Sequence, residues 1–182
     1  MRRRPPPFII RDMSTSPSAA DGFLIRAAAQ SDLPTLLDFR MGMIEDIAAA
    51  GPAKRPWDPD AVRQANGRWL AEHFDRDFAA WLAEVGGRPA GTAAIMWFRH
   101  PPGPRNLSGV EAYVLNVYTK PEFRRRGIAR ALMARVIAEA RAAGIRRVWL
   151  RASREGRPLY EAIGFGTSNY LELAPEVPAA EG

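Results

Sequence analysis

The stretch Pro121-Glu122-Phe123-Arg124-Arg125-Arg126-Gly127-Ile128-Ala129-Arg130 decides the fold of this chain. It follows an apolar run at residues 111–119 that is typical of a β-strand, and it opens a run at residues 128–143 that is typical of a helix. The first N–H groups of a helix have no partner within the helix and carry the positive end of its dipole. A glycine in the turn lets a ligand approach the backbone closely. The stretch therefore predicts a turn that binds an anion, a phosphate above all.

The arginines of this turn allow three interpretations. They could form a solvated helix start, but positive side chains at a helix N-terminus oppose the dipole at a cost of several tenths of a kcal/mol each, and a bound anion would offset that cost. They could bind nucleic acid phosphates, but the helix continues with the core-like residues Ala131-Leu132-Met133 rather than with exposed groups that contact bases. A phosphate-bearing cofactor is the interpretation we favour, and nucleic acid is the weaker alternative.

The segment Arg124-Arg125-Arg126-Gly127-Ile128-Ala129 resembles the acyl-CoA-binding motif Arg/Gln-x-x-Gly-x-Gly/Ala of the GNAT (GCN5-related) N-acetyltransferase superfamily. The pattern Val117-x-Thr119-x-Pro121 precedes it. About thirty residues later, the run from Leu159-Tyr160 to Gly164-Phe165 is similar to the family's second signature, Leu-Tyr-x-x-x-Gly-Phe. Ala129 stands where many members carry a second glycine. Together these motifs span Glu111 to Phe165.

The resemblance implies an α/β fold with a mixed, splayed central sheet in the element order β-α-α-β-β-β-α-β-α-β. Local sequence patterns agree with this order. We expect strands at residues 22–26, 78–85, 88–98, 111–119, 147–150 and 170–173, and helices at residues 31–50, from 58 to about 74, 128–143 and 157–163. Ser31 is the predicted N-cap of the first helix, and Gly86-Gly87 predicts a hairpin turn. Residues 1–21, rich in Pro, Ser and Arg, predict a flexible tail before a domain at 22–182.

The resemblance also implies how acetyl-CoA would bind. The main chain of Val117, Tyr118 and Thr119 would pair with the pantetheine arm like an added strand. The pyrophosphate would rest on the basic turn, with Ser153 as a further contact in place of an asparagine found in some members. The turn residues expected to contribute are Arg124, Arg125, Arg126, Gly127, Ile128, Ala129 and Arg130.

For the chemistry, the resemblance implies direct attack of an amine on the thioester. Tyr160 would protonate the departing thiolate, since a phenol of ordinary pKa is protonated at neutral pH. Glu111 is the candidate general base, acting through a water, although an exposed structural carboxylate is an equal alternative. Glu45 and Asn116 are the candidate acceptor-binding residues. A member that only binds acyl-CoA as a sensor is the main alternative to an enzyme.

Composition sets further limits. The chain has 182 residues, 47% of them hydrophobic and 25% charged, as expected of one globular domain. It contains no cysteine, so thiolate catalysis and disulfides are excluded, and two distant histidines do not favour a metal site. We expect no metal, no membrane span and a cytoplasmic location, with a homodimer left open. The net charge is +6, but the first 12 residues hold four arginines against one aspartate. Met13 is an alternative start that would remove this basic leader.

Overall fold

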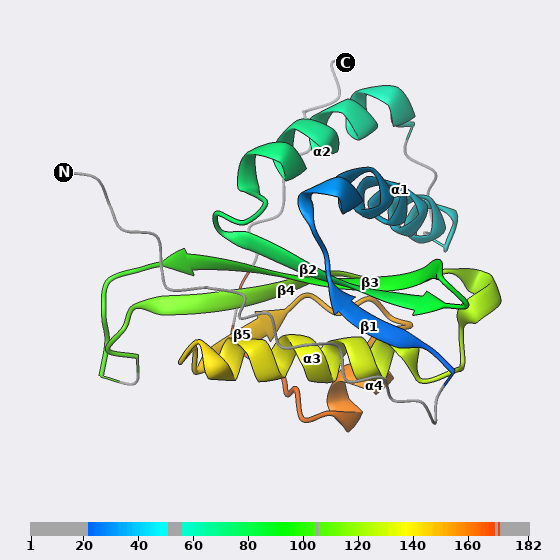
Figure 1. Ribbon diagram of the computed structural model, residues 1–182. Helices are drawn as coiled ribbons and strands as arrows, with labels where there is room; N and C mark the ends of the chain where they lie inside the picture. The colour runs from blue at the N-terminus through cyan, green and yellow to red at the C-terminus, as the bar shows by residue number, and fades with distance from the viewer. Residues whose placement is uncertain (1–21, 51–55, 105, 170, 172–182) are drawn as a thin grey trace, which may run out of the picture. The chain divides into compact units, whose positions relative to one another are not determined.

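The computed structural model describes residues 22–50, 56–104, 106–169 and 171 (Figure 1). The chain divides into two compact units, one up to Arg151 and one from Ala152 onward. The predicted tail at residues 1–21 lies outside the described residues.

A five-stranded sheet forms the centre of the first unit, with the strands in the order β1-β2-β3-β4-β5. Neighbouring strands are antiparallel except for β4 and β5, which are parallel. This mixed sheet confirms the predicted fold class. The strands are β1 (Leu24–Ala27), β2 (Phe78–Val85), β3 (Arg88–Arg99), β4 (Val110–Thr119) and β5 (Arg147–Leu150).

Helices cover both faces of this sheet: α1 (Leu33–Ala50) and α2 (Pro59–His73) lie on one face and α3 (Ile128–Ala142) on the other (Figure 1). Asp58 caps α2 by accepting hydrogen bonds from the N–H groups of Asp60 and Ala61, at 2.9 and 3.1 Å. Each of these helices forms where the apolar spacing predicted it. The layered arrangement places the end of β4 between α1 and the start of α3.

Alternation along the strands supplies the core on each side of the sheet. Under α1 and α2, Leu36, Phe39 and Leu70 pack with strand residues such as Phe78 and Leu82. The α3 face is lined by the intervening strand positions and by buried helix residues. The buried residues of α3 are Ile128, Leu132, Met133, Val136 and Ala140.

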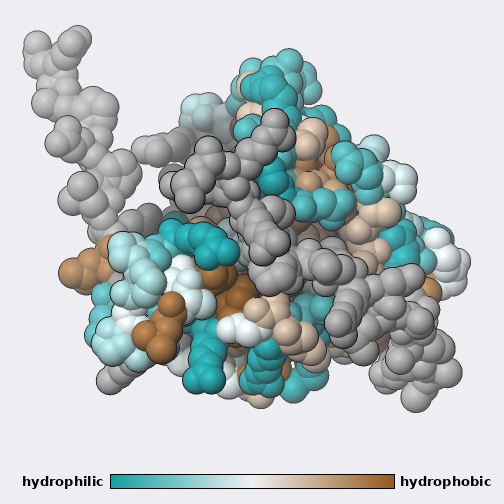
Figure 2. Space-filling model, turned by 60° about the vertical axis from the view of Figure 1, so that its left-hand side comes forward, coloured by the Kyte–Doolittle hydropathy of each residue, from teal (hydrophilic) through white to brown (hydrophobic). Residues whose placement is uncertain are grey.

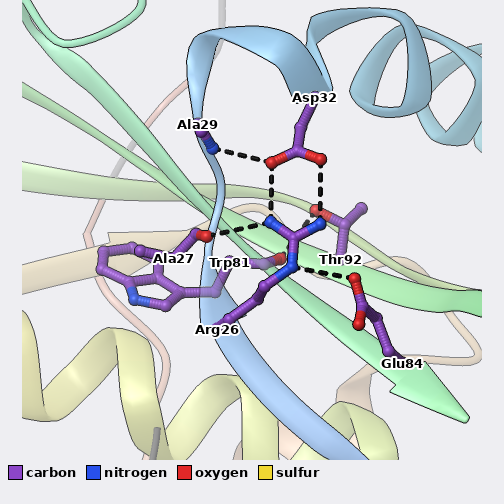
Figure 3. Close-up of polar contacts among 7 residues, drawn as sticks. All are labelled: Arg26, Ala27, Ala29, Asp32, Trp81, Glu84 and Thr92. Atoms are coloured by element: carbon purple, nitrogen blue, oxygen red, sulfur yellow. Dashed lines mark hydrogen bonds and ion pairs between the residues drawn. The ribbon is translucent and has the colours of Figure 1, made fainter. Parts of the chain in front are cut away.

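A charged network fixes the start of α1 against the sheet (Figure 3). Arg26 of β1 binds Asp32 through two hydrogen bonds of 2.6 and 2.9 Å, and its Nε donates to Glu84 of β2 at 2.8 Å. The Ala29 N–H donates to the same Asp32 carboxylate at 2.8 Å. The predicted Ser31 N-cap is therefore wrong: the chain enters α1 through a 3₁₀ turn at Gln30–Asp32, and Asp32 does the capping. The hydrogen bond from Arg26 lowers the pKa of Asp32 below its usual value.

Other local predictions agree closely with the structure. Gly86 and Gly87 both have positive φ, 56° and 75°, as a tight hairpin turn between β2 and β3 requires. Gly144 has φ 75° just beyond the end of α3, which ends that helix as predicted.

The second unit contains α4 (Arg157–Ala162), which matches the short predicted helix. The predicted strand at residues 170–173 falls almost wholly outside the described residues, and Leu171 is not in a strand. Within the part of the chain that is described, no helix has the length and apolar character to cross a membrane. On the face shown in Figure 2, hydrophobic and hydrophilic side chains are interspersed. The large exposed hydrophobic residues among those described are Ile47, Leu107 and Leu171.

Candidate functional site

Strand β4 carries a β-bulge at Asn116, where the backbone has φ 54°. Leu115 pairs with Ala94 and Tyr118 pairs with Thr92, so two residues of β4 stand opposite one residue of β3. As a consequence Leu115 and Tyr118, three positions apart, both pack on the core under α1. The bulge therefore changes which side chains face α1 in the last part of the strand.

The outer edge of β4 is paired only along its first half. The parallel register with β5 runs from Glu111 opposite Arg147 to Val114 opposite Leu150. From Leu115 to Thr119, no strand among the described residues pairs with this edge. A strand edge of this kind offers main-chain N–H and C=O groups to an extended ligand, as predicted for Val117, Tyr118 and Thr119. The Thr119 carbonyl already accepts a 3.0 Å hydrogen bond from Arg124 Nε.

The basic turn follows directly and has the backbone of an anion-binding loop. Arg125 and Gly127 both adopt left-handed φ values, 65° and 79°, with α3 starting at Ile128. Alternation of right- and left-handed residues turns successive N–H groups toward a common point. In the described part of the chain, the backbone N–H groups from Arg125 to Arg130 have no hydrogen-bond acceptor. Arg125 adopts a conformation that costs a residue with a side chain about 1 kcal/mol, which is typical of functional loops.

Two buried side chains hold the turn on either side. Phe123 is 6% exposed and Ile128 is 1% exposed, whereas the residues from Arg124 to Gly127 are exposed. Phe123 belongs to a 3₁₀ turn at Pro121–Phe123. The guanidinium of Arg126 lies over the Phe123 ring at 5.6 Å from its centre. The turn is thus fixed at its ends and accessible in its middle.

Asp46 connects helix α1 to both β4 and this turn. Its carboxylate accepts hydrogen bonds from the Tyr118 hydroxyl, at 3.1 Å, and from Arg124 Nη2. The Arg124 guanidinium also lies 5.7 Å from the centre of the Tyr118 ring. Burial, together with the hydrogen bond to Asp46, raises the pKa of Tyr118 above its usual value. The Tyr118 side chain is therefore engaged with α1, while its main chain lies along the part of β4 that β5 does not pair.

Arg40, which was not among the predicted acceptor-binding residues Glu45 and Asn116, forms a second connection between α1 and β4. Its Nη1 donates to Asn116 Oδ1 at 3.0 Å, and its Nε donates to Asn66 Oδ1 of α2 at 3.2 Å. Asn116, predicted as an acceptor-binding residue, thus lies at the bulge with its side chain turned to Arg40. An asparagine inside an apolar strand is the local signal that could have indicated this left-handed position.

Glu45, the other predicted acceptor residue, is exposed on α1. It lies five positions after Arg40, so the helical repeat places the two side chains on different sides of the helix. Its role in acceptor binding stays a prediction.

Glu111 lies near the start of β4, far along the strand from the bulge. At about 3.3 Å per residue, five residues separate the two positions by roughly 16 Å. Glu111 is only 4% exposed, so the exposed carboxylate considered from sequence is wrong. Its Oε1 lies 3.0 Å from His100 Nε2 and 3.1 Å from Arg147 Nη1. The catalytic role of Glu111 remains a prediction.

Tyr160 and Ser153 belong to the second unit. Tyr160 lies on α4 and is 9% exposed, and its ring makes an edge contact with Phe165 at 6.2 Å. Gly156 makes room for it, since an added Cβ there would be 2.8 Å from Tyr160 Cε2. Ser153 Oγ accepts a 3.1 Å hydrogen bond from the Gly156 N–H. The second motif thus forms a compact turn around the tyrosine, with Ser153 engaged in the turn itself.

The described residues hold no group of histidine, aspartate and glutamate side chains arranged to bind a metal ion. The side chains and N–H groups around the turn are instead suited to an anionic ligand.

The model of the acetyltransferase (GNAT) family matches residues 42–165, which include the β4 edge, the basic turn and Tyr160. The chain belongs to the GNAT acetyltransferase family. No curated protein matches the chain.

Solved structures agree with this GNAT assignment. A predicted acetyltransferase from Clostridium acetobutylicum, crystallised with acetyl-CoA, is 28% identical, covers 84% of this chain and 96% of its own, and has a TM-score of 0.73. A GCN5-related N-acetyltransferase from Ralstonia eutropha JMP134 is 29% identical. The match covers 85% of this chain and 99% of the other, with a TM-score of 0.75. The aminoglycoside acetyltransferase AAC(6')-Iy, in complex with a bisubstrate analog, shares the fold at 20% identity. The match covers 85% of this chain and 98% of the other, with a TM-score of 0.59.

The GNAT family and these neighbours support acyl transfer as the general chemistry of this chain, with an acyl-CoA as the donor. The fold and the family predicted from the basic turn are confirmed.

Proposed function

We propose that this GNAT protein transfers the acetyl group of acetyl-CoA to a primary amine by direct attack within a ternary complex. The observation that carries the proposal is the row of backbone N–H groups from Arg125 to Arg130 beside the unpaired edge of β4. A pyrophosphate fits the first feature and the amide-rich pantetheine arm fits the second. A single extended ligand that carries both groups is a coenzyme A thioester.

The turn would bind the pyrophosphate through main-chain N–H groups and the positive end of α3. The side chains of Arg125, Arg126 and Arg130 would add positive charge around it, because Arg125 to Gly127 and Arg130 are exposed. Ser153 stays a proposed contact of the cofactor. The edge of β4 at residues 117–119 would pair with the pantetheine arm. An acetyltransferase neighbour crystallised with acetyl-CoA supports this choice of donor.

In the reaction, the neutral amine nitrogen would form a bond to the thioester carbonyl carbon while the bond from that carbon to sulfur breaks. A main-chain N–H of β4 would stabilise the negative charge that develops on the carbonyl oxygen. Tyr160 would give its proton to the departing thiolate, and the amine would lose a proton to solvent or to a base. Glu111 acting through water is the base we predicted. The chain has no cysteine, so no acyl-cysteine intermediate forms.

Two other functions stay open to the same experiments. A sensor would bind acetyl-CoA and release CoA only slowly, whichever amine is present. A nucleic-acid-binding protein would bind DNA in a salt-dependent way that acetyl-CoA does not compete. The cytoplasmic location and a homodimer also remain proposals.

The decisive test is a CoA-release assay over a panel of amines, combined with calorimetric titration of acetyl-CoA. Tyr160→Phe is expected to lower kcat by about 10²-fold or more, as for a lost general acid, with an unchanged Kd for acetyl-CoA. Arg63→Gln, which removes only an exposed ion pair between α1 and α2, serves as the control. Normal turnover by Tyr160→Phe would remove the tyrosine from the mechanism, and acetyl-CoA binding without any amine turnover would favour the sensor.

A further inference from the structure

Arg40 is an inward cation without a carboxylate partner in the described part of the chain. Its hydrogen-bond acceptors there are the side-chain oxygens of Asn66 and Asn116, which are neutral amides. Other arginines of the same unit bind carboxylates: Arg26 binds Asp32, and Arg63 binds Asp38. A guanidinium carries five N–H donors, so hydrogen bonds through Nε and one Nη1 proton leave donors for a ligand.

The partial burial of Arg40 increases the energetic cost of its unpaired charge. The side chain is partly buried, and this burial lowers the pKa of Arg40 below its usual value. A desolvated cation without a counter-ion is costly, and a bound anion would recover that cost. The same partial burial still leaves part of the side chain open to a ligand.

Asn66 orients one side of this cluster. Its Nδ2 donates to the Val62 carbonyl at 2.8 Å, which fixes the amide so that Oδ1 accepts from Arg40. Asn116 holds the other side from the bulge of β4. The guanidinium therefore has a fixed position between α1, α2 and β4, and a fixed guanidinium binds carboxylates with defined geometry.

The carboxylates of α1 near the bulge do not bind Arg40. Asp46 of α1 is bound by both Tyr118 and Arg124. Glu45 lies on a different side of the helix from Arg40. Among the described residues around the bulge, Arg40 is thus a positive charge that no carboxylate neutralises.

We propose that Arg40, Asn66 and Asn116 form a subsite for a carboxylate of the acceptor, so that the preferred substrate is an amine that also carries a carboxylate, as amino acids do. This inference rests on the proposed function, because it places the acceptor between α1 and the β4 bulge. Arg40 would bind the carboxylate with its remaining N–H groups while the amine faces the β4 edge. Purely cationic amines, such as polyamines, would be repelled by the same side chain.

The test compares amines that differ only in the carboxylate. Glycine, β-alanine and γ-aminobutyrate would each be assayed against the corresponding amide, with kcat/KM measured at saturating acetyl-CoA. For at least one pair, we expect kcat/KM to be about tenfold or more higher for the carboxylate than for the amide. This ratio corresponds to the free energy of one charge-assisted hydrogen bond. A uniform preference for the amides across all pairs would overturn the proposal and leave acetyl transfer itself intact.

Variants separate a binding role from a structural one. Arg40→Gln is expected to lower the carboxylate-to-amide ratio of kcat/KM by about tenfold, and Arg40→Lys to recover part of it. Asn116→Asp keeps the side-chain shape, tolerates the left-handed backbone and supplies an internal carboxylate to Arg40, so it should lower the same ratio without loss of folding. Arg63→Gln removes an arginine from the exposed α1–α2 ion pair and is the matched control. An equal loss for both members of each pair in Arg40→Gln and Asn116→Asp would show that Arg40 only braces the fold.

A binding measurement keeps the inference independent of turnover. N-acetylglycine, the product expected from glycine, would be titrated into the CoA-bound protein by calorimetry. Binding that weakens about tenfold in Arg40→Gln supports the subsite even if no amine in the panel is acetylated. Equal binding by wild type and Arg40→Gln, or no binding by either, would refute it.

Discussion

Gly91 lies where the end of β4 and the start of α3 meet, beside the proposed cofactor site, and replacing it with alanine tests that packing. Gly91 belongs to β3 and pairs with Thr119 of β4. A Cβ at this position would stand 2.9 Å from the Tyr118 carbonyl oxygen, 3.1 Å from Ile128 Cγ2 and 3.2 Å from Thr119 Oγ1. The first of these distances is shorter than contact allows, and its partner is backbone, so β4 must move.

The magnitude follows from two opposing terms. Overpacking by one methyl group in a close-packed region costs about 1–3 kcal/mol. Gly91 is not among the glycines with positive φ, so alanine can adopt the backbone and gains about 0.4–1 kcal/mol from a less flexible unfolded chain. The net loss of stability is therefore about 0.5–2 kcal/mol, or a Tm lower by roughly 2–6 °C.

The same displacement should weaken the binding of acetyl-CoA. Ile128 begins α3 at the anion-binding turn, and the Tyr118 carbonyl belongs to the edge that would pair with pantetheine. A loss of about 1 kcal/mol in binding corresponds to roughly a fivefold higher Kd. Urea unfolding and calorimetric titration of acetyl-CoA would measure the two effects on the same sample.

Gly103→Ala is the matched control, since a Cβ there would meet nothing within 4 Å and its φ is not positive. This variant should unfold and bind acetyl-CoA like the wild type. The reasoning fails if Gly91→Ala is as stable as Gly103→Ala and binds acetyl-CoA with the same Kd.

Four further predictions follow from the ion pairs. In Asp46→Asn, the pKa of Tyr118 should fall because an anionic hydrogen-bond acceptor is lost, as an absorbance titration at the tyrosinate band would show; an unmoved titration would contradict the contact. The stability lost in Asp46→Asn should stay below about 1 kcal/mol, because both charged partners of this pair are nearly half exposed. Glu111→Gln should lower the free energy of unfolding by about 1–3 kcal/mol through its lost ion pairs, whereas a normal stability with a pH-dependent fall in kcat/KM would support the base role instead. Arg26 lowers the pKa of Asp32, so the stability from this pair is present above about pH 4 and is lost as the pH falls through the lowered value; the difference in unfolding free energy between wild type and Asp32→Asn should shrink between pH 7 and pH 3.

The local sequence was enough to predict the helices and strands and the anion-binding turn. Apolar periodicity, Asp58-Pro59, Gly86-Gly87 and the Gly127 turn each act over a few residues, and the four helices and the first five strands formed where they predicted. The strand predicted at residues 170–173 lies almost wholly outside the described residues. The Ser31 cap was wrong because Asp32 is held by Arg26 of β1, and Arg26 is itself held by Glu84 of β2, far along the sequence. Local preference for a cap residue cannot include such a partner.

The sequence by itself determined that this is a GNAT fold with an anion-binding turn. The strand, the turn and the helix start follow one another in the chain, and the first N–H groups of a helix have no acceptor within it. Only the tertiary structure decided what lies opposite that turn. The bulge at Asn116 reverses the direction of the side chains after it, so that α1 brings Arg40 and Asp46 to β4 from some seventy residues away. Within the described residues, packing then leaves Arg40 without a carboxylate partner and binds Glu111 into contacts with His100 and Arg147. Charge, distance and burial at that site are properties of packing between distant segments, which no local pattern contains.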